Sequence, residues 1–76
     1  SPSFISSWLD SKYSYEFISE LVSDNNGFCQ TFLNGKKAKK IVQQHYLGNY
    51  QYSYIIWLML VLEIWHSVFI NNKKNI

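Results

Sequence analysis

Two side chains near the carboxyl end of this sequence are of types that do chemistry together. Glu63 and His66 stand three residues apart, a spacing that places both on one face of a helix. They could share a proton or bind a metal ion, but two ligands are too few for a zinc site. We therefore interpret them as part of a polar stripe that pairs locally or meets solvent, and we expect no metal site.

His45 and Cys29 are the other candidates, and each has a structural interpretation. No carboxylate or nucleophile stands at a spacing from His45 that would indicate a catalytic pair. We therefore favour a packed histidine, hydrogen-bonded near the end of its helix, over a general base. Cys29 is the only cysteine, which excludes an internal disulfide. Free cysteines behave mostly as small buried hydrophobes. We predict no catalytic, cofactor-binding or metal-binding residue in this chain.

Four lysines lie close together in the stretch KKAKK, Lys36 to Lys40, and tyrosines follow at positions 46, 50, 52 and 54. Such a combination is able to follow a phosphate backbone and to stack on bases. The net charge of +2 is nevertheless small for a nucleic-acid-binding protein. We favour a solvated lysine face with a rim of tyrosines. The alternative is a small helical interaction or nucleic-acid-binding module that uses the Lys36–Lys40 face.

Helices must position these side chains, and capping residues and apolar spacing indicate where the helices lie. Ser1-Pro2 is typical of a helix start, and apolar residues at 4, 5, 8 and 9 predict a short first helix that ends near Asp10-Ser11. A second helix is predicted from about Ser14 to Asn25-Asn26-Gly27, with positions 17, 18, 21 and 22 on its apolar face. For Phe28 to Leu33 we favour a loop with its aromatic side chains turned inward.

The third predicted helix has the clearest signals. Asn34 is suited to cap its start, and Gly48 is suited to the left-handed position just past its end. Apolar residues at 38, 41 and 42 recur with His45 on one face, and the four lysines gather on the opposite arc. The helix is therefore expected to be amphipathic.

The most apolar stretch, IIWLMLVLEIWHSVFI, belongs to a fourth helix predicted from residues 49–52 to Ile70. Its apolar residues fill an arc of about 200°, so we expect a helix surrounded by protein on most sides, with Glu63, His66 and Ser67 on a narrow polar stripe. A membrane span is not expected. The uninterrupted apolar run from Tyr54 to Leu62 is much shorter than the roughly 20 residues required, and Glu63 would lie near the middle of the span.

Together these elements predict an all-α fold, a small bundle of about four helices in residues 1–76, with the last, about 50–70, the most buried. A chain of this length is only marginally stable by itself. Its three Trp, six Tyr and five Phe residues are a large apolar content for so small a body. A partner surface, or the remainder of a larger protein, is therefore expected to cover part of it.

Several motifs occur along the chain in an order and spacing that resemble those of a known protein family. Pro2 and Trp8-Leu9 come first, IVQQHYLG (Ile41 to Gly48) follows, and IWLMLVLEIW (Ile56 to Trp65) with Phe69 closes the series. In order and spacing these residues resemble the C-terminal end of the synthetase domain of the glutamine-hydrolysing asparagine synthetase family.

The resemblance implies a parent enzyme that activates aspartate with ATP as an acyl-adenylate, which ammonia from glutamine then attacks. ATP and Mg²⁺ are implied for that parent only, because this chain contains no Ser-Gly-Gly-x-Asp-Ser pyrophosphate loop and residue 1 is Ser rather than the glutaminase Cys. We expect a C-terminal helical segment of a cytoplasmic protein, structural and non-catalytic by itself. Its expected partners are the remainder of the synthetase domain or a second copy, through an exposed apolar patch, with neither nucleic acid nor membrane.

Overall fold

The computed structural model describes residues 7–9 and 11–70. In these ranges the chain forms four α-helices and one 3₁₀ helix: α2 (Lys12–Ser23), α3 (Phe28–Phe32), α4 (Gly35–Tyr46), η1 (Tyr50–Tyr52) and α5 (Ser53–Phe69). Residues 7–9 are also helical, and no strand occurs in the described ranges. The predicted all-α fold is thus confirmed. The rest of the expected first helix, residues 1–6 and residue 10, lies outside the described residues.

Helix α2 begins at Lys12, two residues before the predicted start, because Ser11 caps it. The Ser11 hydroxyl accepts a hydrogen bond from the Ser14 amide at 3.2 Å, which satisfies one of the amides that a helix start leaves unpaired. Ile18 and Val22 are buried on the predicted apolar face, whereas Phe17 is exposed.

The segment Phe28–Phe32 forms the short helix α3, so the prediction of a loop there was wrong. The cause lies in another element. Gly27, at the N-cap position, has no side chain that could bind the first amides. The carboxylate of Glu63, 35 residues after Phe28, binds them instead.

Helix α4 confirms the predicted amphipathic element. The Asn34 side chain accepts a hydrogen bond from the Lys37 amide at 3.0 Å, and Gly48 adopts a positive φ of 112° just past the helix end. Ala38, Val42 and His45 are buried, while the lysines of the same helix are exposed. Sequence and structure agree here because the caps, the apolar spacing and the charges all indicate the same boundaries.

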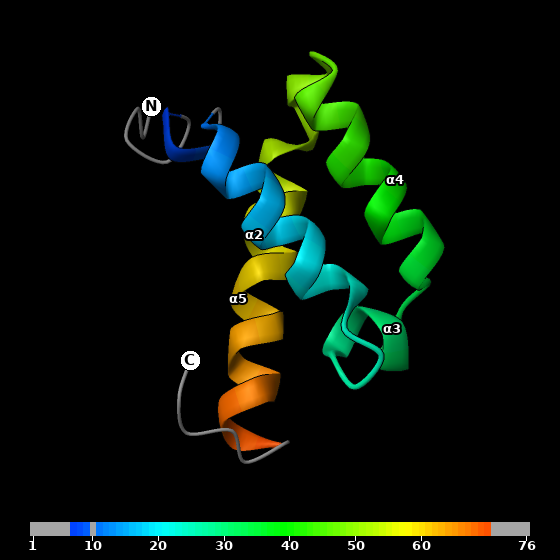
Figure 1. Cartoon of the computed structure of the whole chain (residues 1–76). Coiled ribbons are helices and arrows are strands. Elements are labelled where there is room, and N and C mark those ends of the chain that lie inside the picture. Colours follow the sequence, from blue (N-terminus) through cyan, green and yellow to red (C-terminus); the bar gives the residue numbers. More distant parts are fainter. Residues whose placement is uncertain (1–6, 10, 71–76) are drawn as a thin grey trace.

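The helices pack around one small core (Figure 1). Helix α2 lies across α5 and beside α4, and α3 contacts the other helices near the carboxyl end of α2. Every α-helix contributes to the cluster of buried apolar residues, which consists of Leu9, Ile18, Val22, Cys29, Ala38, Val42, Ile56, Met59 and Leu60. This core is small, and most of the aromatic side chains lie outside it.

Helix α5 contributes six buried residues, more than any other described helix, as predicted for the last helix. The predicted orientation of that helix was wrong, however. Three of the six buried residues are Glu63, His66 and Ser67, the polar stripe that was expected to pair locally or to meet solvent. The exposed residues of α5 are instead its apolar ones, so the helix is not surrounded by protein over the predicted arc.

Candidate functional site

One side of α5 forms a continuous apolar surface. All eight exposed residues of this helix are aliphatic or aromatic, and none carries a charge. At 100° per residue they occupy an arc of about 140°. We call this surface the α5 apolar face, and its members are Tyr54, Ile55, Leu58, Val61, Leu62, Trp65, Val68 and Phe69. Exposed apolar surface that is contiguous in this way marks contact sites more often than isolated apolar residues do.

The face is oriented by the polar residues on the opposite side of α5. The two carboxylate oxygens of Glu63 accept hydrogen bonds from the backbone amides of Phe28 at 2.9 Å and Cys29 at 2.8 Å. Glu63 is only 2% exposed, and a buried carboxylate is tolerated only when it is hydrogen-bonded in this way. Two of the otherwise unpaired amides at the start of α3 thus hold α5 in one rotational setting.

Cys29 completes this buried cluster. Burial raises the pKa of the Cys29 thiol from its usual 9.0 to about 12, and the thiol's hydrogen bond to Glu63 and the charge of that carboxylate add to the shift. The thiol is therefore protonated at neutral pH and is a poor nucleophile. This agrees with the prediction that Cys29 is a buried structural residue.

His66 lies beside the same cluster, where it is 3% exposed. Its ring meets those of Phe28 and Phe32 edge-on, with centroid distances of 6.0 Å and 5.6 Å. Glu63 and His66 therefore lie on the side of α5 that faces α3, and each of them contacts residues of α3. The pair has a packing role at this junction.

His45 has the structural environment predicted for it. The residue is buried near the end of α4, and its Nδ1 atom lies 3.3 Å from the Ser53 hydroxyl at the start of α5. Its ring also contacts those of Tyr46 and Tyr50 edge-on. His45 therefore joins α4, η1 and α5.

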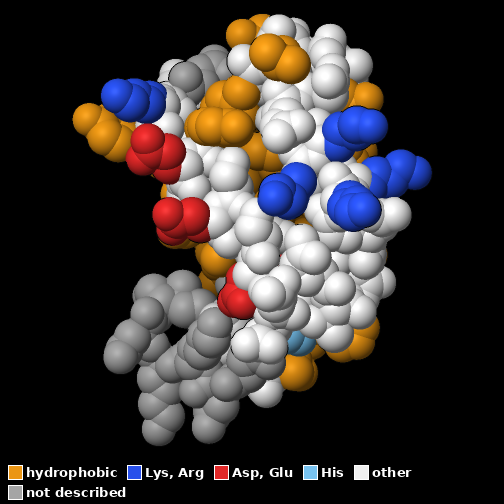
Figure 2. Space-filling model, turned by 45° about the vertical axis from the view of Figure 1, so that its right-hand side comes forward, with side chains coloured by type: hydrophobic (Ala, Val, Ile, Leu, Met, Phe, Trp, Pro, Cys, Tyr) orange, Lys and Arg blue, Asp and Glu red, His pale blue; other side chains and the backbone are white. Residues whose placement is uncertain are grey.

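The lysines gather on a different surface from the α5 apolar face. Figure 2 shows a group of basic side chains on the right of the view, whereas the acidic side chains lie on the left with a further basic side chain beside them. Lys36, Lys37, Lys39 and Lys40 are all exposed, and with Asn34 and Gln43 they line a shallow hollow of about 540 Å³. The predicted solvated lysine face is present.

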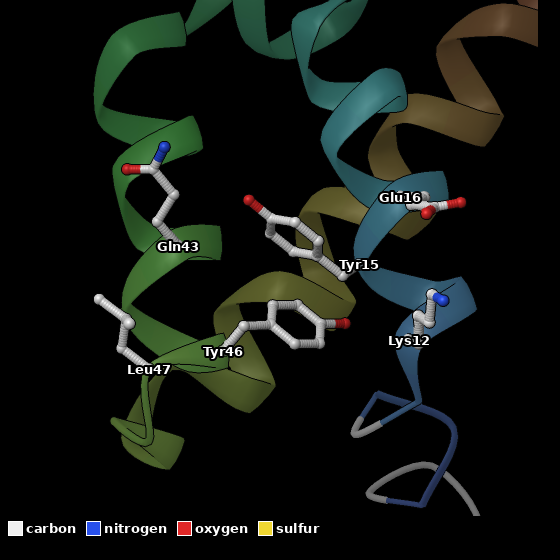
Figure 3. Close-up of a pocket in the computed structure, with 6 residues that line it drawn as sticks. All are labelled: Lys12, Tyr15, Glu16, Gln43, Tyr46 and Leu47. Carbon is white, nitrogen blue, oxygen red and sulfur yellow. The ribbon is translucent and has the colours of Figure 1, made fainter.

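A second hollow, of about 680 Å³, lies between α2 and α4 and is lined by Lys12, Tyr15, Glu16, Gln43, Tyr46 and Leu47. Figure 3 shows the two tyrosine rings between the helices, with Glu16 turned away from them. The rings meet edge-on at 4.9 Å, and the Tyr46 hydroxyl lies 2.6 Å from the Ser14 hydroxyl. These contacts join the two helices, and no nucleophile beside a general base is found among the residues of this hollow.

The described residues contain no group of three or more His, Cys, Asp or Glu side chains that could hold a metal ion. One stretch, Tyr50–Phe69, is 20 residues long and apolar enough by length and composition alone to cross a membrane. A mostly buried core helix of a soluble protein meets the same two criteria, and here 28% of the window is buried. Within this stretch Glu63 is committed to hydrogen bonds with α3.

The prediction had the two sides of α5 reversed: the apolar face was expected to be buried, and Glu63 was expected to pair locally or to meet solvent. Helical periodicity separates the two sides of α5 correctly, but it does not show which side faces the core. One signal was available in the sequence: Gly27 precedes a segment that could form a helix but offers no side chain to cap it. The first amides of such a helix need water or an acceptor from elsewhere in the chain, and the sequence does not show that Glu63 is that acceptor.

No protein-family model matches the chain, and neither does any curated protein or any solved structure.

Proposed function

We propose that this chain is a C-terminal helical segment of an asparagine-synthetase-like, ATP-dependent amidotransferase, and that it acts there as a structural contact element. Alone it is non-catalytic. In this proposal the chain supplies a folded helical surface that packs against protein, and the parent enzyme, with ATP and Mg²⁺, forms the amide.

One observation carries the proposal, which is the α5 apolar face. A C-terminal segment that packs against other protein requires an exposed apolar surface when that protein is absent, and α5 offers one without a charged residue. The apolar face includes residues of the stretch Ile56 to Trp65, in which the resemblance to the synthetase tail is greatest.

The rest of the chain supports a structural role. Glu63, His66 and His45 are each used in contacts between helices. The Cys29 thiol is held in its protonated form by a pKa raised to about 12. The partners considered for such a segment are the remainder of the synthetase domain or a second copy of the chain, and both would cover the α5 apolar face.

The coding sequence upstream of the Ser1 codon tests this family assignment. An in-frame Ser-Gly-Gly-x-Asp-Ser motif upstream is the expected result. A start codon directly before Ser1 would contradict the assignment. In the protein encoded by the longer reading frame, ATP-dependent amide formation should require the segment, and removal of residues 1–76 should abolish activity or soluble expression.

An alternative function is favoured by the lysine face alone. The four exposed lysines of α4 and the hollow that they line form a basic surface, which suits a small interaction or nucleic-acid-binding module. This alternative predicts binding to DNA or RNA that weakens steeply as salt rises. The electrophoretic mobility of DNA or RNA mixed with the chain at low salt tests this alternative, and the absence of any retardation would exclude it.

A further inference from the structure

We propose that the α5 apolar face pairs with the same face of a second copy of the chain, in an antiparallel arrangement whose two-fold axis passes between Val61 and Leu62. This inference rests on the proposed function in one respect, that the face is a contact with protein, and it identifies that protein.

The spacing of the exposed residues is the first support. Along α5 the eight positions are separated by 1, 3, 3, 1, 3, 3 and 1 residues, a series that is the same in both directions. When two copies run antiparallel about the midpoint, every member of the face therefore lies at the same height as another member. The residues at equal heights are Tyr54 and Phe69, Ile55 and Val68, Leu58 and Trp65, and Val61 and Leu62, of which Leu58, Trp65, Tyr54 and Phe69 lie nearest the centre of the face.

The same spacing suits the packing of two helices. Positions 54, 61 and 68 recur every seven residues, as do 55, 62 and 69, and 58 and 65. An apolar repeat of seven residues keeps one side of a helix against its partner when the two cross at about 20°. Medium-sized Val61 and Leu62 lie at the centre of the repeat, while the large rings of Tyr54 and Phe69 lie at its ends.

The area of the face is the second support. From the exposed fractions of its eight residues, the face presents on the order of 800 Å², about the area that each partner contributes to a standard protein–protein interface. Isologous pairing uses the same patch twice, and the absence of charges means that no like charges are brought together at the axis.

A groove beside the α5 apolar face is the third support for the pairing. Leu33, Ala38, Ile41, Ile55 and Met59, with Asn34 and Lys37 at its polar side, line an apolar groove of about 270 Å³. Ile55 lies near the amino end of α5, where antiparallel pairing brings the carboxyl end of the second helix. Phe69 and Ile70 of the second copy, both more than half exposed in the single chain, would fill this groove.

Light scattering on a size-exclusion column tests the pairing without detergent. We expect the unaltered chain to have twice its monomer mass of 9.0 kDa and to dissociate on dilution. Val61→Glu, at the axis, should remain helical by circular dichroism and raise the dimer dissociation constant by at least about 30-fold, as for a central interface position. Tyr13→Glu is the matched control, because Tyr13 is an exposed aromatic residue of α2, and it should leave the dimer unchanged.

A complementary pair of variants identifies the partner as a second copy. Val61→Glu and Val61→Lys should each be monomeric alone and should form a one-to-one dimer when mixed, since the two copies of position 61 lie next to the axis on the same side of the interface. In a Cys29→Ser background, Tyr54→Cys should form a disulfide with Phe69→Cys in a mixture, and neither variant should form a disulfide with itself.

Three outcomes would overturn the proposal: a monomer at every concentration, association that Val61→Glu leaves unchanged, or self-cross-linking of Tyr54→Cys. Binding of a monomeric chain to phosphatidylcholine vesicles would also overturn it and would identify lipid as the occupant of the face. Failure in any of these ways leaves the family assignment standing, because that assignment is tested separately, by the upstream coding sequence and by removal of residues 1–76 from the longer protein.

Discussion

Glu63 connects two helices through a single side chain. Its carboxylate binds the amides of Phe28 and Cys29, and it also helps to raise the pKa of the Cys29 thiol. A Cβ at position 27 would lie 2.5 Å from Glu63 Oε1 and 3.1 Å from the Asp24 carbonyl oxygen. Gly27 is therefore required for the close approach of the carboxylate, and the two residues form one unit.

Replacement of Glu63 should lower the free energy of unfolding, and the loss should grow with the number of acceptor oxygens that are removed. We expect Glu63→Leu to lower the free energy of unfolding by about 2–4 kcal/mol, because the buried Cys29 amide and the partly buried Phe28 amide lose their acceptor. Glu63→Gln keeps one acceptor oxygen and should cost less. Urea unfolding followed by circular dichroism measures both, and equal stability of Glu63→Leu and the unaltered chain would contradict this role. Gly27→Ala should also destabilise the fold by displacing the carboxylate.

Cys29 should make stability fall at alkaline pH. Its pKa is raised from 9.0 to about 12 in the folded chain, so between these values the unfolded chain loses the thiol proton first. The unfolded state then binds fewer protons than the folded state, and stability decreases as pH rises from about 9 to 12. The stability that depends on the protonated thiol is fully present below pH 9.

Unfolding in urea at a series of pH values measures this effect. Tyrosines and lysines ionise in the same range, so Cys29→Ser is the control, because its hydroxyl does not ionise there. The unaltered chain should lose more stability than Cys29→Ser as pH rises from 9 to 11. Parallel pH profiles for the two proteins would show that the thiol does not contribute.

At the scale of the helices, the sequence predicts an element well where its own residues determine it. Asn34 and Gly48 set the ends of α4, and the spacing of Ala38 and Val42 sets its buried side, so both were predictable. Helix α3 was not, because the acceptor for its first amides comes from α5. Local spacing contains no information on a partner 35 residues away.

The orientation of α5 was mispredicted for a related reason. Burial of apolar side chains usually decides which side of a helix faces the core, and on α5 that rule favours the arc that contains Trp65. The opposite arc is favoured in the structure because Glu63 satisfies the amides of α3 while Ile56, Met59 and Leu60 still enter the core. The candidate site is the arc that this arrangement leaves outside.

The end of α4 allows a direct test of backbone geometry. Gly48 has a φ of 112°, and nothing lies within 4 Å of the place where a Cβ would be. Gly48→Ala should therefore destabilise the chain by about 1 kcal/mol through backbone strain alone. Gly48→Asn should cost less, because Asn tolerates positive φ better. Thermal unfolding of both variants checks this, and an Ala variant as stable as the Gly form would contradict it.

At the scale of the molecule, the aromatic content lies largely outside the core. The core is built from nine mostly small or aliphatic residues, while Trp65, Phe69 and Tyr54 are exposed on α5. A chain of this size has little stability to spare. Much of the apolar surface of the described residues thus does not contribute to the core of the single chain.

Stability should therefore depend on protein concentration. If the α5 apolar face pairs, the folded dimer is favoured over unfolded monomers by mass action, so Tm should rise by about 3–6 °C for each tenfold increase in concentration of a chain this short. Val61→Glu, which removes the pairing, should show a Tm independent of concentration. Thermal unfolding followed by circular dichroism over a hundredfold range of concentration compares the two. A Tm that does not change with concentration in the unaltered chain would mean that the single chain is stable without a partner on α5.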